Sequence, residues 1–181
     1  MPVSRETMLS KLRDAYAVYF DDEVCPDSIA HLAACYAFHS TNECFVISKK
    51  VKLWSAETHE YVYVFSLPHL RVQDFEACRD QAREHGLNRV RPHIDHKSTF
   101  VTAVFVCDSI EAEAARLLEK TRFHKDFLFS LHGWMDFRAA AVELGTGKVF
   151  VNGAARDLKE FMLGNLAVYK ITLLTFHLTK R

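Results

Sequence analysis

The chain has 181 residues, of which 49% are hydrophobic and 25% charged, a composition typical of globular domains and not of disordered chains. Its 23 basic and 23 acidic residues give a formal net charge of zero, which argues against a protein that works through nucleic-acid or membrane electrostatics. The sequence contains no apolar run approaching the 18 or so residues of a membrane-spanning helix. It therefore predicts one soluble domain over residues 1–181.

The cysteines and the N-terminal residues indicate the compartment. The five cysteines are odd in number and none has a partner in a CxxC pair: Cys25, Cys35, Cys44, Cys78 and Cys107. They are typical of free thiols in a reducing compartment. A disulfide between Cys35 and Cys44, facing each other across a hairpin, is the alternative. The first 20 residues carry several charges and do not resemble a signal peptide, so we expect a cytoplasmic protein.

Helical and strand patterns alternate along the first part of the chain. Apolar residues spaced by three and four predict a helix over residues 5–20 with one buried face, formed by Leu9, Leu12, Tyr16 and Tyr19. Aromatic and β-branched residues predict strands over 32–38 and 44–54, joined by a hairpin loop at the polar segment 39–42. The continuous apolar run 61–65 predicts a strand buried on both faces.

The second part of the chain repeats this alternation. A helix is predicted over residues 71–85, with Gly86 as its stop signal. The apolar run 100–107 predicts a second strand buried on both faces, and Ser109 is expected to cap a helix that ends near Lys120. Three antiparallel strands, a helix and a last strand are expected to follow, over residues 127–131, 134–144, 148–151, 154–166 and 169–178.

These elements define the fold class. A helix joins the two buried strands at 61–65 and 100–107, so the strands are expected to be parallel with a right-handed crossover. The sequence therefore predicts an α/β fold with one mixed sheet, a central parallel βαβ unit, antiparallel hairpins and helices packed on its faces. The segment 168–181 is predicted to be an edge strand or a tail that contacts a second copy, which would make the protein a homodimer.

Histidines are unusually frequent, and several stand beside acids just before predicted strands. If the strands beginning near 61, 100 and 127 are parallel, the residues that precede them share one edge of the sheet. This edge groups eight residues, Glu57 and Asp126 among them, and the predicted metal ligands are His59, Glu60, His93, Asp95, His96 and His124. Imidazole and carboxylate together suit zinc, manganese or iron, and an open coordination position could activate water.

The alternative interpretation is that these are polar residues of solvated loops. Ligands in open α/β sheets usually bind beyond the carboxyl ends of the strands. That opposite edge offers only His69, Asp108 and Ser109.

A second candidate site lies on the strand predicted at 134–144. Residues Trp134, Asp136 and Arg138 are two apart, so their side chains face the same side. They could line a pocket for a small ligand, with Asp136 and Arg138 as an ion pair. The alternative is a half-buried aromatic residue beside a surface ion pair of little energetic weight.

Two functions follow from these patterns. The favoured one is a binding domain, for a small ligand or for a second copy of itself. The alternative is a divalent-metal-dependent hydrolase, such as a phosphodiesterase or a nuclease-like enzyme. The element order over 5–108 resembles the core of restriction-endonuclease-like nucleases, although Val62 stands where that family has the lysine of its Glu-x-Lys pattern. Basic residues near Trp54 offer a nucleic-acid contact, but a solvated strand face explains them equally well.

Overall fold

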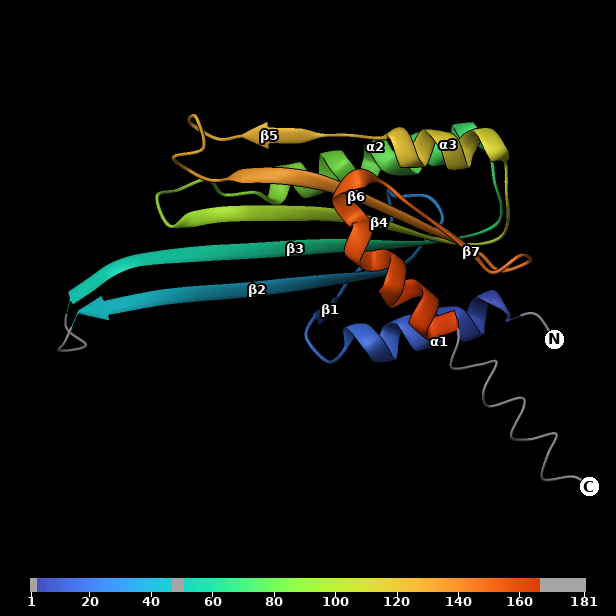
Figure 1. Ribbon diagram of the computed structural model, residues 1–181, viewed down its shortest axis with the longest axis horizontal. Coiled ribbons are helices and arrows are strands. Elements are labelled where there is room, and N and C mark those ends of the chain that lie inside the picture. Colours follow the sequence, from blue (N-terminus) through green and yellow to red (C-terminus); the bar gives the residue numbers. More distant parts are fainter. Residues whose placement is uncertain (1–2, 47–50, 167–181) are drawn as a thin grey trace, which may run out of the picture.

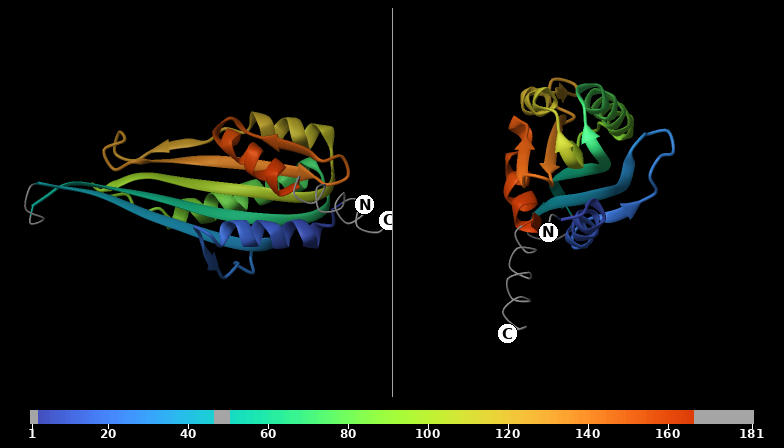
Figure 2. Two further views of the ribbon diagram at one scale, coloured as in Figure 1. Left: turned by 60° about the horizontal axis from the view of Figure 1, so that its bottom comes forward. Right: turned by 90° about the vertical axis from the view of Figure 1, so that its right-hand side faces the viewer.

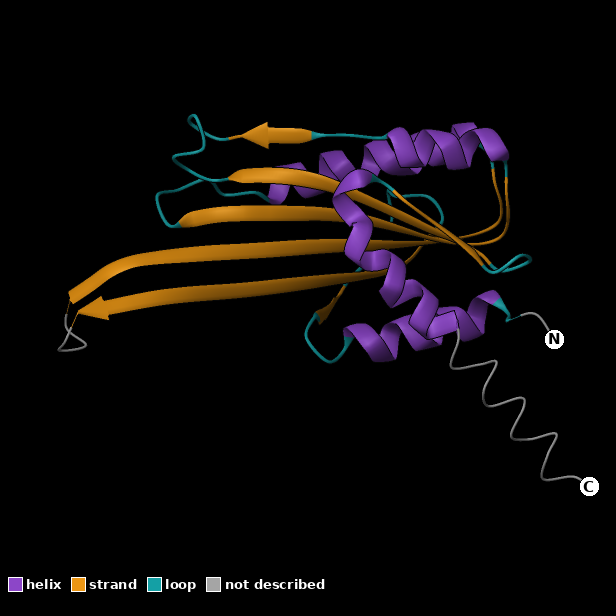
Figure 3. Cartoon of the chain, viewed as in Figure 1, coloured by secondary structure: helices purple, strands orange, loops and turns teal. Residues whose placement is uncertain are grey.

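The structure is a computed structural model that describes residues 3–46 and 51–166 (Figures 1 and 3). Its helices are α1 (Arg5–Tyr16), α2 (Val72–Arg89), α3 (Ala112–Lys120), the short 3-10 helix η1 (Gly153–Ala155) and a helix over residues 156–166. Its strands are β1 (Asp21–Glu23), β2 (Leu32–Val46), β3 (Val51–Leu70), β4 (His96–Ile110), β5 (His124–Asp126), β6 (Trp134–Glu143) and β7 (Lys148–Val151).

All seven of these strands belong to one mixed sheet. The order across the sheet is β1-β2-β3-β4-β6-β5, and β7 also pairs with β6. Strands β3, β4 and β6 run parallel to one another, whereas the other pairs are antiparallel. The predicted fold class, a mixed sheet around a parallel βαβ unit, is confirmed.

Helices cover both faces of the sheet (Figure 2). Residues Tyr61, Tyr63 and Phe65 of β3 pack against α2 and α3, and we call this side the α2 face. The alternate residues Val62 and Val64 pack against α1 and the helix over 156–166, on the side we call the α1 face. Because successive side chains of a strand point to opposite faces, a run of five apolar residues fills two cores at once.

Strand β4 follows the same rule beside β3. From Val101 to Cys107 every residue is buried, and the Phe105 ring stacks on Phe65 with centroids 5.0 Å apart. The sequence prediction that both strands are central and covered on both sides is therefore confirmed.

The position predicted for the turn of the first hairpin is wrong. The polar segment 39–42 is not a loop but the middle of β2, whose pairing with β3 runs from Leu32↔Phe65 to Val46↔Val51. Two long strands replace the three short ones expected, and their far ends extend beyond the helices (Figure 1). A strand that extends beyond the helices has solvent on both sides, so polar residues in it do not indicate a loop.

The alternative to free thiols, a disulfide between Cys35 and Cys44, is excluded by the same change. Both residues belong to β2, nine positions apart on one extended strand, and Cys35 is a free thiol. At about 3.4 Å per residue their backbones lie roughly 30 Å apart, far beyond disulfide reach.

Three predicted helix boundaries are also wrong. Helix α1 ends at Tyr16, and Tyr19 is 75% exposed instead of buried. Helix α2 continues through Gly86, which is buried against β4 where a Cβ atom would lie 2.5 Å from a Val101 methyl group. Glycine at position 86 is therefore explained by close packing against β4 and not by the end of the helix. Ser109 belongs to β4, and the residue before α3 is Glu111.

The strand predicted at 127–131 is absent. The short strand β5 precedes it, and Leu128, Phe129 and Ser130 form a turn with positive φ angles. Strand β5 is antiparallel to β6, so the third parallel strand of the sheet is β6. The strand predicted at 169–178 lies outside the described residues, and the homodimer that rests on it stays a prediction. Within the described ranges, no helix has both the length and the apolar character needed to span a membrane.

Candidate metal centre

Imidazole and carboxylate side chains gather where β4 begins, at one end of the parallel strands. Glu57 and His59 come from β3, and His93 and Asp95 come from the connection between α2 and β4. Because β3 and β4 are parallel, the connection that leads into β4 arrives beside the middle of the long strand β3.

A β-bulge fixes the connection against β3. Glu57 pairs with His96 and Thr58 pairs with Ser98, so Lys97 is an extra residue in β4. The backbone N–H of Glu57 donates to the Asp95 carbonyl at 2.8 Å, which extends the ladder beyond the strand end. Bulges of this kind re-aim side chains and are frequent beside functional sites.

The side chains of Glu57, His93 and Asp95 converge. Among the described residues they form the group that could hold a metal ion, because one ligand atom from each lies within 4.8 Å of the others. His93 Nε2 is 3.1 Å from the Glu57 carboxylate, and all three residues are half-buried. Ligands of one ion at about 2.1 Å lie at most about 4.2 Å apart, so small side-chain rotations would complete the coordination.

His59 borders this group. Its Nε2 lies 3.7 Å from the same Glu57 oxygen, and its Nδ1 lies 2.7 Å from Nδ1 of His39, the directly opposite residue on β2. Burial, together with the neighbouring His39 and His96, lowers the pKa of His59 and favours its neutral form. Sequence analysis missed His39 because the polar segment around it was interpreted as a loop.

His96 is close to the group but fully engaged elsewhere. It is 3% exposed, its Nδ1–H donates to the His132 carbonyl at 2.7 Å, and its Nε2 accepts from the Thr99 hydroxyl at 2.9 Å. Its ring also stacks on His59 with centroids 6.0 Å apart. With both nitrogens occupied, His96 supports the neighbouring imidazole and ties the 132–133 turn to β4.

Glu60, another predicted ligand, lies on the α1 face and thus across the sheet from His59. Its carboxylate accepts from the Thr102 hydroxyl at 2.6 Å and from the Arg138 guanidinium at 3.1 Å. Burial raises the pKa of Glu60, against the opposing effect of Arg138. Adjacent residues of a strand face opposite ways, a signal already present in the sequence that separates His59 from Glu60.

His124, the remaining predicted ligand, is placed in β5 with partners of its own. Its Nδ1 is 2.6 Å from the Asp136 carboxylate and its Nε2 is 3.3 Å from Asp126. These contacts place the His124 ring on the α1 face of the sheet, beside Asp136 of β6. The structure therefore brings together Glu57, His93 and Asp95, with His59 beside them, and leaves Glu60 and His124 in separate clusters.

The hydrogen bond to Asp136 raises the pKa of His124, and Asp126 adds to the effect. We expect Asp136→Asn to lower this pKa toward that of an ordinary histidine, as measured by an NMR titration of the His124 ring proton. Asp126→Asn is the matched control and should lower it less, because Asp126 is the more distant partner. An equal or larger shift in Asp126→Asn contradicts this assignment. The stability that His124 contributes is present at acid pH and lost as pH rises through its raised pKa.

Trp134 and Arg138 lie on the same face of the sheet, as predicted, since both contact the Phe100 ring. The Trp134 ring centroid and the Arg138 guanidinium carbon each lie 5.3 Å from the Phe100 centroid, on the α1 face. The expected Asp136–Arg138 ion pair is wrong. Arg138 pairs with Glu60 and Asp157, whereas Asp136 pairs with His124. Two residues on one face of a strand can each find a closer partner on a neighbouring element.

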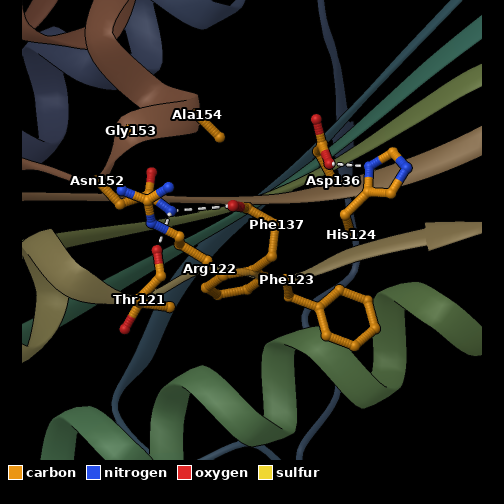
Figure 4. A pocket seen from close by; sticks show the side chains of 9 residues that line it. All are labelled: Thr121, Arg122, Phe123, His124, Asp136, Phe137, Asn152, Gly153 and Ala154. Carbon is orange, nitrogen blue, oxygen red and sulfur yellow. Dashed lines mark hydrogen bonds and ion pairs between the residues drawn. The ribbon is translucent and has the colours of Figure 1, made fainter.

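A cavity of about 270 Å³ lies beside the His124–Asp136 pair (Figure 4). Neither Trp134 nor Arg138 lines it; Asp136, Arg122 and the start of η1 do. The buried Asn152 holds its wall together, donating to the carbonyls of Thr121 and Phe137 at 3.1 and 3.0 Å. The volume suits a small ligand, close to the lower end of common binding pockets.

The opposite edge of the sheet carries His69 and Asp108, as the parallel arrangement predicts. His69 Nδ1 lies 2.7 Å from the Ser109 hydroxyl, and Asp108 accepts from Arg5 at 3.0 Å. These side chains thus pair with their neighbours. They offer a histidine remote from the Glu57 group that can serve as a control in binding experiments.

Residues 4–163 match the family model described as a domain of unknown function, DUF8052. The chain belongs to this family. No curated protein and no solved structure matches the chain. The matched span of this DUF8052 domain includes the whole sheet, the Glu57–His93–Asp95 group and the cavity beside His124.

Proposed function

We propose that this DUF8052 domain binds a divalent transition-metal ion through Glu57, His93 and Asp95. The observation that carries the proposal is the convergence of one imidazole and two carboxylates to within 4.8 Å. Nitrogen and oxygen donors in this ratio suit Zn²⁺, Mn²⁺ or Fe²⁺. From the sequence, metal ions enter only with the alternative hypothesis of a hydrolase, and the favoured binding of a small ligand or of a second copy stays a prediction.

The surroundings of the three side chains support this proposal. The hydrogen bond between the Glu57 N–H and the Asp95 carbonyl holds the backbones of these two residues side by side. His59 stands 3.7 Å from Glu57 and can orient its carboxylate as an outer-shell partner. A half-buried site of this kind remains accessible to an ion from solvent.

The test is metal binding by the untagged full chain, measured by titration calorimetry and by metal content after gel filtration. We expect His93→Ala to weaken Zn²⁺ and Mn²⁺ binding by more than the roughly 10- to 100-fold that loss of an outer-shell partner costs. His69→Ala removes a histidine at the opposite edge and should bind both ions like the unmodified chain. Equal affinities in His93→Ala and the unmodified chain would overturn the proposal.

Metal-dependent hydrolysis is the second candidate function. The His93 side chain is 43% exposed and that of Glu57 is 27% exposed, so three protein ligands leave room for water on the ion. In the same metal-loaded samples, release of nitrophenolate from bis(p-nitrophenyl) phosphate that is lost in His93→Ala supports hydrolysis. Bound metal without turnover favours a binding domain.

We further propose that the domain works in a reducing compartment such as the cytoplasm. Four described cysteines are free thiols, namely Cys25, Cys35, Cys78 and Cys107. Burial raises the pKa of Cys78 to about 11 and that of Cys107 to about 12. Thiols of this kind are unreactive core residues, which suits a protein that does not depend on disulfides.

A further inference from the structure

His39 and His59 form a cross-strand pair next to the Glu57 group. They are direct neighbours in the antiparallel ladder of β2 and β3, with Nδ1 atoms 2.7 Å apart and ring centroids 4.9 Å apart. The Tyr61 ring packs edge-on against His39, with the ring centroids 5.8 Å apart. Two imidazoles on one face of adjacent strands thus aim their Nδ1 atoms at one point.

We propose that this pair is a second divalent-metal site, which takes Zn²⁺, Ni²⁺ or Cu²⁺ between Nδ1 of His39 and Nδ1 of His59. Without an ion, the short contact is a hydrogen bond in which one Nδ1–H donates to the other nitrogen. Two nitrogens on a tetrahedral Zn²⁺ lie roughly 3.3 Å apart, so the rings must part by roughly 0.6 Å. Because His39 is exposed, it has room for that movement.

Glu57 links this site to the first one. When Nδ1 of His59 binds an ion, Nε2 carries the proton and points at the Glu57 carboxylate, 3.7 Å away. A carboxylate that accepts from the far nitrogen of a metal-bound histidine fixes its tautomer and raises its basicity. The inference rests on the proposed function in this one respect, since Glu57 would be a ligand of one ion and an outer-shell partner of the other.

The donor atoms predict different ion preferences at the two sites. The first offers one nitrogen and two carboxylates, which Mn²⁺ accepts, whereas the second offers two imidazole nitrogens, which favour Zn²⁺, Ni²⁺ and Cu²⁺ over Mn²⁺. The untagged chain should therefore bind two equivalents of Zn²⁺ and one of Mn²⁺. The site with two protein ligands should be the weaker one for Zn²⁺.

The decisive experiment counts bound ions in four full-length proteins: the unmodified chain, His39→Ala, His93→Ala and the control His69→Ala. We expect His39→Ala to bind one Zn²⁺ and keep its Mn²⁺, His93→Ala to keep one Zn²⁺ and lose its Mn²⁺, and His69→Ala to match the unmodified chain. Far-UV circular dichroism verifies that each variant is folded, and His39→Asn repeats the test with a side chain that keeps a polar group. Copper bound to His93→Ala should also give an electron paramagnetic resonance spectrum with coupling to two imidazole nitrogens.

Failure of the two proposals is distinguishable. One Zn²⁺ that His93→Ala removes and His39→Ala leaves in place overturns the second site and retains the first. One Zn²⁺ that His39→Ala removes and His93→Ala leaves in place overturns the proposed function and retains the second site. Absence of any bound Zn²⁺ in the unmodified chain overturns both.

Discussion

Replacing Arg138 by methionine is expected to destabilise the domain by about 3–5 kcal/mol, because it leaves a buried carboxylate without its counter-charge. Arg138 is 6% exposed and pairs with Glu60 and Asp157. The Asp157 side chain is 72% exposed and can be solvated by water, whereas the Glu60 side chain is only 14% exposed. Most of the loss should therefore come from Glu60. Chemical denaturation of the two proteins gives the difference in the free energy of unfolding.

The pH dependence of that difference identifies its cause. Burial raises the pKa of Glu60, so the ionised carboxylate opposes folding above this pKa and the opposition fades as pH falls. Loss of Arg138 removes the main charge that counteracts the shift, which must raise the Glu60 pKa further. The stability deficit of Arg138→Met should thus be larger at about pH 7.5 than at about pH 5.

A double variant separates the ion pair from the packing of the arginine side chain. Glu60→Gln combined with Arg138→Met removes both charges, and it should recover more than half of the loss seen in Arg138→Met alone. Two results contradict the interpretation. One is a loss of stability below about 1 kcal/mol in Arg138→Met, which would mean that the ion pair behaves as an exposed one. The other is a double variant in which the losses caused by Glu60→Gln and by Arg138→Met simply add.

The parallel unit could be predicted because its strands are apolar on both faces. Tyr61 to Phe65 and Val101 to Cys107 are continuous apolar runs joined by a helix, and steric rules permit one crossover hand for such a unit. The long β2–β3 hairpin could not be predicted, because residues 39–42 lie beyond the helices and lack any apolar pattern. Burial leaves a periodic signal in a sequence, whereas pairing between two solvated strands does not.

The candidate site could be predicted in part for a related reason. The connection that precedes β4 does lie at the predicted edge, which brings His93 and Asp95 beside Glu57. Glu57 and His59, however, lie inside the long strand β3 and not before it as predicted. The prediction that His124 is a metal ligand depended on a strand at 127–131, and that segment is a turn. Glu60 was included although its neighbour His59 must face the other way. The alternation of side chains in a strand, applied within the group, would have excluded it.

The turn that leads into β6 depends on Gly133, and Gly133→Ala is expected to cost about 2–4 kcal/mol. Gly133 has a φ angle of +77°, and a Cβ atom there would lie 2.5 Å from Nδ1 of His96 and 2.6 Å from the carbonyl oxygens of His96 and Lys97. Backbone oxygens in a ladder cannot move aside as the end of a flexible side chain can. The variant must therefore bear both an unfavourable backbone conformation and a displacement of the β4 bulge.

Gly147→Ala is the matched control for this variant. Gly147 has a similar φ angle of +71°, but nothing lies within 4 Å of the position of its Cβ atom. Its replacement should cost only the backbone strain, about 1 kcal/mol. The excess loss in Gly133→Ala, measured by urea denaturation, then reports the collision with His96 and Lys97 alone. Equal losses in the two variants would mean that the 132–133 turn is free to move away from β4, and that His96 does not hold it in place.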